Sequence, residues 1–146
     1  MNFKDILEGV FDENSEEFEI ISDTYNLITS TVPSVAAECK TNLILLDNAR
    51  IKLSTLYYML YRNISKIRRG VESIYNAQYT RLVKVGRPSK DAIEAEIKAS
   101  SPDYLIASQK IEDYEAVRDL ISMYIRCVDN TRSSTLEILK NIYRVD

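Results

Sequence analysis

The chain has 146 residues with only three glycines and three prolines, which suits a single domain and favours helices over a sheet. It contains no histidine, so the commonest general base and metal ligand is missing. The net charge of −3 conceals a sorting of charge along the chain. Residues 1–39 carry one basic residue against nine acidic ones, residues 40–90 eleven against two, and residues 91–146 seven against eleven. The basic middle segment is therefore a candidate functional surface.

Enzymatic and membrane-spanning functions are disfavoured. The sequence has no phosphate-binding glycine loop, nucleophile motif or metal-spaced cysteine cluster, so we expect no catalytic residue, no cofactor and no metal site. Cys39 and Cys127 are isolated thiols, as expected in a reducing compartment. No apolar run reaches the roughly 18 residues of a membrane span, and the N-terminus lacks the features of a signal peptide. We therefore expect a cytoplasmic protein.

Residues 1–33 form an acidic segment in which two short helices are predicted. Residues 3–11 place four apolar side chains on one helical face. Asn14 is the predicted N-cap of the second helix, with Glu17 completing a capping box. Pro33 disfavours helical geometry in the residue before it, so the second helix ends there. The apolar face of the second helix consists of Phe18, Ile21, Tyr25 and Ile28.

Residues 34–85 read as one long basic helix that begins at a capping Ser34. Alternating steps of four and three residues give a heptad seam over more than five repeats. The predicted seam residues are Cys39, Leu43, Leu46, Arg50, Leu53, Tyr57, Leu60, Ile64, Ile67, Val71, Ile74 and Gln78. A helix of this length cannot bury its seam against itself, so other helices must cover it.

Residues 86–101 form a turn with a short helix, because glycine and proline break the long helix and Ser89 can cap the next one. Ser101 and Pro102 then begin a second long helix over residues 102–146. Its predicted seam residues are Ala107, Ile111, Tyr114, Arg118, Ile121, Ile125, Val128, Arg132, Thr135, Leu139 and Ile142.

The predicted fold is all-α and forms a single helical domain over residues 1–146. It is an elongated antiparallel pair of long heptad helices, with short N-terminal helices and a short connecting helix. Arg50, Arg118 and Arg132 interrupt the two seams. These arginines either fix the register or the oligomeric state through buried pairing, or extend their charged ends outward at wet parts of the seam.

Apolar residues outside the two seams exceed what a two-helix hairpin can bury. The N-terminal helices can cover some of them, and we expect self-association into a homo-oligomer to cover the rest. These residues are Ile44, Leu45, Ile51, Met59, Leu105, Ile106, Leu120 and Met123.

The basic middle segment combines cations with tyrosines, as single-stranded nucleic-acid binding requires: cations contact phosphates and rings stack on bases. Alternatively, the cations only balance the acidic segments while the tyrosines pack sideways. Lys52 also lies on the outer positions of the long helix. The candidate nucleic-acid-binding residues are Arg62, Lys66, Arg68, Arg69, Arg81, Lys84, Arg87, Lys90, Tyr58, Tyr61, Tyr75 and Tyr79.

The order of these parts over residues 75–146 resembles the UvsY family of phage recombination mediators. The matching features are Tyr75 to Gly86, Ser89-Lys90 to Ile97, Asp103-Tyr104, and Asn130-Thr131-Arg132 to Ile142. The resemblance implies a ring-like oligomer that binds single-stranded DNA and helps a RecA-like recombinase displace the single-strand-binding protein. It also implies the host-cell cytoplasm as the location, and DNA-binding or assembly roles for Arg81, Lys84, Lys90 and Arg132. The acidic N-terminal segment departs from the more basic character of that family.

We therefore expect a non-enzymatic, oligomeric, single-stranded DNA-binding recombination mediator. One alternative is a helical scaffold or adaptor that acts through coiled-coil contacts. Another is an inhibitor of a nucleic-acid enzyme whose acidic segments imitate DNA. Salt separates these functions in part, because phosphate binding weakens steeply with salt and apolar association does not.

Overall fold

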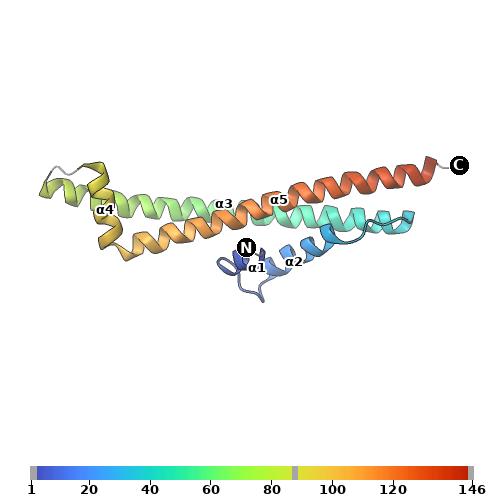
Figure 1. Cartoon of the computed structure of the whole chain (residues 1–146), viewed down its shortest axis with the longest axis horizontal. Helices are drawn as coiled ribbons and strands as arrows, with labels where there is room; N and C mark the ends of the chain where they lie inside the picture. Colours follow the sequence, from blue (N-terminus) through green and yellow to red (C-terminus); the bar gives the residue numbers. More distant parts are fainter. Residues whose placement is uncertain (1–2, 87–88, 145–146) are drawn as a thin grey trace.

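A computed structural model describes residues 3–86 and 89–144 of the chain. Its described residues form five helices and no strand, which confirms the predicted all-α fold (Figure 1). The helices are α1 (Phe3–Glu8), α2 (Glu16–Thr29), α3 (Ala36–Val85), α4 (Lys90–Ser100) and α5 (Pro102–Arg144). None of the described helices combines the length and the apolar character that a membrane crossing needs.

Helices α3 and α5 form a long antiparallel hairpin, with α4 turned across one of its ends (Figure 1). The 50 residues of α3 span about 75 Å at 1.5 Å per residue. Leu53, Leu60 and Ile64 of α3 are buried, as are Ile121 and Val128 of α5. All five occupy predicted seam positions, so the heptad pattern correctly identified the surfaces that the two helices bury.

Helices α1 and α2 pack against one side of this hairpin (Figure 1). Leu7, Phe18 and Ile21 join one buried cluster with residues of α3 and α5. The same cluster contains Leu120, and Met59 packs against it. The N-terminal helices therefore cover part of the apolar surface that exceeds the two seams.

Two of the predicted helix starts are wrong. Ser15, rather than Asn14, caps α2: its hydroxyl oxygen accepts a hydrogen bond from the backbone N–H of Phe18 at 3.2 Å. The turn that precedes α2 places Ser15 at the helix start, because Ser15 donates from its own N–H and hydroxyl to the carbonyl oxygen of Asp12. Ser34 does not cap α3, which begins after an extended Val35 that makes no side-chain capping bond.

The caps predicted for the two later helices are confirmed. The hydroxyl oxygen of Ser89 accepts a hydrogen bond from the N–H of Ala92 at 3.2 Å, at the start of α4. Ser101 accepts one from the N–H of Tyr104 at 3.4 Å, and α5 begins at Pro102. Serine caps thus set both boundaries of the connection that lets the chain reverse direction between α3 and α5.

Candidate nucleic-acid interface

Two ion pairs fix how α3 and α5 face one another. Arg50 donates to both carboxylate oxygens of Asp129, from Nε at 2.7 Å and from Nη2 at 3.2 Å. Arg132 donates from Nε to Asp47 at 2.7 Å. All four side chains are about half exposed, so the arginines extend to the rim of the seam and are paired there. The sequence left two alternatives open for Arg50 and Arg132, namely pairing with an acid or extension of the charged end outward, and both arginines do both.

These pairs are reciprocal, because each helix supplies one acid and one arginine three residues later. The sequence 47–50 reads Asp-Asn-Ala-Arg and the sequence 129–132 reads Asp-Asn-Thr-Arg. In an antiparallel pair of helices, the aspartate of each four-residue repeat faces the arginine of the other repeat. The two aspartates were not predicted from the sequence, although this repeat was the signal that could have identified them.

The pairing also affects the ionisation of Arg50. The hydrogen bonds to Asp129, followed by the negative charge of that carboxylate, raise the pKa of Arg50 above its ordinary value. Arg118, the third arginine of the seams, makes no such bridge to α3. It donates instead to the adjacent Asp119 on its own helix, from Nη2 at 3.2 Å.

The candidate binding residues on α3 do not form one continuous patch. Arg68 forms an ion pair with Glu115 of α5, so a carboxylate already neutralises its charge. Arg62, Lys66 and Arg69 are exposed on another face of α3. No carboxylate in residues 3–86 or 89–144 lies within ion-pairing distance of these three.

The three free cations follow the spacing i, i+4 and i+7, which aligns them along one side of a helix. They extend over about 10 Å of the helix axis. Tyr58 lies one turn before Arg62 and Tyr61 directly precedes it, with 66% and 56% of their surfaces exposed. We call these five residues the outer cluster; they combine free positive charge with accessible aromatic rings.

A second group lies at the end of α3 near the connection to α4. The rings of Tyr75 and Tyr79 are stacked with their centroids 6.1 Å apart. Arg81 donates from Nε to the side-chain oxygen of Gln78 at 3.0 Å, and Lys90 is exposed at the start of α4. Arg87 and the side chain of Lys84 lie outside the part that the structure describes. We call Tyr75, Tyr79, Arg81 and Lys90 the tip cluster.

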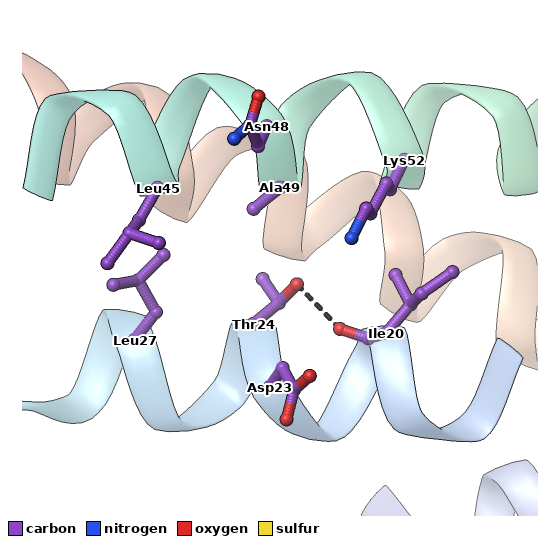
Figure 2. A pocket seen from close by; sticks show the side chains of 8 residues that line it. All are labelled: Ile20, Asp23, Thr24, Leu27, Leu45, Asn48, Ala49 and Lys52. Atoms are coloured by element: carbon purple, nitrogen blue, oxygen red, sulfur yellow. Dashed lines mark hydrogen bonds between the residues drawn. The ribbon is translucent and has the colours of Figure 1, made fainter. Parts of the chain in front are cut away.

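Lys52 is separated from the outer cluster by its position beside α2. It lines a hollow of about 310 Å³ between α2 and α3, and its side chain extends toward α2 (Figure 2). Apolar side chains, including Ile20 and Leu45, form much of the wall. The hydroxyl of Thr24 is engaged, because it donates to the carbonyl oxygen of Ile20 at 2.8 Å. The hollow therefore offers Lys52 as its one cation and no hydroxyl that is free to donate.

The acidic N-terminal helices leave the outer cluster open. The first turn of α2 lies beside Thr55 and Met59 of α3, where Glu16 and Glu17 line a shallow hollow. Among the side chains that the structure describes, no carboxylate of α2 forms an ion pair with α3. The acidic segment is thus placed on the middle of the hairpin and not across Arg62–Arg69.

Comparisons with known proteins supply no relative for the chain: no protein-family model matches it, nor does any curated protein or solved structure. The resemblance of residues 75–146 to recombination mediators therefore stays a prediction. Within the described residues, no group of three or more cysteine or carboxylate side chains could hold a metal ion.

Proposed function

We propose that the chain binds single-stranded DNA through α3 and serves as an oligomeric recombination mediator. The observation that carries this proposal is the outer cluster, in which Arg62, Lys66 and Arg69 are aligned and unpaired beside two exposed tyrosines. Binding of phosphates by such cations releases condensed counterions, which is the main source of affinity in sequence-independent recognition.

The tyrosines favour a single strand over a duplex. Bases in a duplex are already stacked on one another, whereas those of a single strand are free to stack on aromatic rings. Tyr58 and Tyr61 expose more than half of their surfaces next to Arg62, so phosphates and bases of one strand can be contacted together. The tip cluster repeats this combination of rings and cations farther along α3.

The mediator activity rests on the sequence resemblance and on the absence of predicted catalytic groups. The expected partners are a RecA-like recombinase and the single-strand-binding protein that it replaces. In this activity α3 contributes binding and positioning of the strand, and the chain catalyses no covalent step.

Fluorescence anisotropy of a labelled oligonucleotide tests the proposal. Titrations with a single strand and with a duplex of equal length are expected to show tighter binding of the single strand, and weaker binding of both at higher salt. A Tyr58→Ala/Tyr61→Ala variant should lose most of the preference for the single strand. Its matched control is Tyr143→Ala, which alters an exposed tyrosine at the far end of α5. Equal affinity for the two forms, or no binding at low salt, would rule the proposal out.

A scaffold or adaptor protein is the second candidate. Ile44 and Ile51 of α3 and Ile106 of α5 remain exposed, and apolar side chains at such positions are typical of helix–helix contacts. This function needs no nucleic acid. It predicts stable self-association or partner binding that changes little with salt.

A further inference from the structure

The two long helices carry outward faces of opposite charge. On α3, the positions that face away from the seam recur at steps of seven and four residues and form what we call the basic edge: Ile44, Ile51, Tyr58, Arg62 and Arg69. On α5, the corresponding positions form the acidic edge: Leu105, Glu112, Ala116, Asp119 and Met123. All ten residues are exposed, with Ile44 and Ile51 more than 60% accessible.

Among the described residues, the charges on these edges lack partners that neutralise them. Glu112 and Arg62 make no ion pair among the described residues. Asp119 contacts only the neighbouring Arg118, and 72% of its side chain remains exposed. Arg69 donates only to the carbonyl oxygen of Ser65 on its own helix, at 3.4 Å. Both edges can therefore bind a surface of opposite charge.

The two edges match in an antiparallel register. When Arg69 is placed opposite Glu112, the common heptad spacing also places Arg62 opposite Asp119. The same register places Tyr58 opposite Met123, a favourable contact between sulfur and an aromatic ring. It also brings the small Ser65 and Ala116 together between the two charged pairs, where they allow close approach.

A parallel arrangement fits less well. It can pair Arg62 with Glu112 and Arg69 with Asp119, since both pairs of positions are seven residues apart. Ile44 would then lie beyond the first residue of α5, and Tyr58 would face Ser108. The antiparallel register pairs the same four charged residues and adds the contact between Tyr58 and Met123, so it is the favoured one.

We propose that the basic edge of α3 binds the acidic edge of α5 from a second copy of this chain. The contact is heterologous, so one copy of the pair keeps a free acidic edge and the other keeps a free basic edge, and further copies can add at both ends. Complementary charge identifies the occupant, because the edge that matches Arg62, Arg69 and Tyr58 of α3 belongs to the same chain.

The register further indicates how neighbouring copies are arranged. Within the hairpin, a residue of α3 faces the residue of α5 for which the two residue numbers add to 179, as for Arg50 and Asp129. In the proposed contact between copies, the two residue numbers add to 181, as for Arg62 and Asp119. The two registers differ by two residues, which is about 3 Å along a helix. Successive hairpins therefore lie side by side with little axial displacement, an arrangement that can close into a ring.

The contact uses part of the outer cluster, so self-association and the proposed DNA binding are linked. A neighbouring copy covers Arg62, Arg69 and Tyr58, whereas Lys66, Tyr61 and the tip cluster lie beside the contact. A strand that binds the outer cluster must displace the acidic edge of the neighbour. Substitutions in the acidic edge of α5 that weaken the contact should consequently strengthen DNA binding, because the DNA strand and the acidic edge of the neighbour compete for the same cations.

Charge reversal on each edge tests the proposed contact. One variant carries Arg62→Glu and Arg69→Glu, and the other carries Glu112→Lys and Asp119→Lys. Sedimentation velocity is expected to show oligomers for the unaltered chain and monomers of 16.8 kDa for either variant alone. An equimolar mixture of the two variants should form oligomers again, because each altered edge then meets an edge of opposite charge.

The controls separate a specific contact from a general effect of charge. A Lys98→Glu/Lys140→Glu variant alters exposed cations outside both edges and should keep its oligomers. Circular dichroism should show unchanged helix content in every variant. A monomeric unaltered chain, oligomers that persist in either reversed variant, or a mixture that stays monomeric would each overturn the proposal.

The same variants distinguish this inference from the proposed function. Glu112→Lys/Asp119→Lys leaves the outer cluster intact and should bind a single strand several-fold more tightly than the unaltered chain. If neither protein binds DNA while mixing still restores oligomers, the proposed function fails and the contact between copies stands. If DNA binds but reversal leaves the oligomers unchanged, the proposed contact fails alone.

Discussion

At the scale of single residues, the ion pairs between α3 and α5 set register more than they add stability. Arg50 and Asp129 are joined by two hydrogen bonds, yet both side chains are nearly half exposed. Solvent screening keeps the contribution of such exposed pairs to the free energy of unfolding small. Their reciprocal arrangement with Asp47 and Arg132 instead disfavours slipped alignments, which would place like charges together.

A double-mutant cycle measures this interaction. Arg50→Gln and Asp129→Asn, alone and combined, should give a small favourable coupling in the free energy of unfolding by urea. The coupling should shrink in 1 M salt, because both groups are accessible to ions. Arg126→Gln combined with Asp129→Asn is the control, since no ion pair joins those residues. A coupling no larger than the control would show that the pair does not stabilise the hairpin.

A second prediction at this scale concerns Tyr124, which is buried on α5. Burial, followed by the nearby Tyr25 and Cys127, raises the pKa of its phenol above the ordinary value of 10.0. The folded chain therefore retains this proton at a pH where the unfolded chain has lost it. The resulting stability is complete below pH 10 and is lost as the pH rises from there through the raised pKa.

Absorbance at 295 nm can follow that titration. One component should ionise above the ordinary tyrosine value, and Tyr124→Phe should remove it. Tyr58→Phe, at an exposed position, is the control and should leave this late component in place. A late component that survives in Tyr124→Phe would assign it to another residue.

Residue-scale features were only partly predictable from the sequence. Ser89 and Ser101 were identified as caps because glycine or proline marks each break. Asn14 was wrongly chosen over Ser15, because two polar residues in succession can both cap and only the turn from Asp12 decides between them. The bond between Arg68 and Glu115 could not be read from spacing, because it depends on how the hairpin is aligned.

At the scale of elements, the heptad seam is the feature that the sequence specifies most clearly. Apolar residues at steps of four and three identified the buried sides of both long helices. The side of the hairpin that α1 and α2 cover was not predictable, because both long helices offer extra apolar residues. The structure buries Leu120 beneath the N-terminal helices and leaves Ile44 and Ile51 exposed.

Leu60 tests the contribution of the seam. Its side chain is fully buried in the cluster shared by α3 and α5, so Leu60→Ala should lower the free energy of unfolding by about 2–5 kcal/mol. Ile51→Ala removes a side chain of similar size from an exposed position, and its effect should stay within about 0.5 kcal/mol when measured on monomers. Similar losses for the two variants would contradict the assignment of the buried side of α3.

At the scale of the whole molecule, the fold separates the segments of opposite charge. The acidic helices α1 and α2 lie on one side of the middle of the hairpin (Figure 1), where the first turn of α2 lies beside Thr55 and Met59 of α3. Folding therefore neutralises Arg50 and Arg68 and leaves Arg62, Lys66 and Arg69 without a carboxylate partner. Such a distribution is expected of a surface that binds a polyanion.

The salt dependence of single-strand binding tests this account most directly. Anisotropy titrations over a range of salt give the slope of log K against log salt, for the unaltered chain and for Arg62→Gln/Lys66→Gln/Arg69→Gln. Lys98→Gln/Lys110→Gln/Lys140→Gln serves as a control of equal net charge. Loss of three phosphate contacts should reduce the slope by about 2, while the control keeps the slope of the unaltered chain. Equal slopes for all three proteins would show that the strand is not bound by this face of α3.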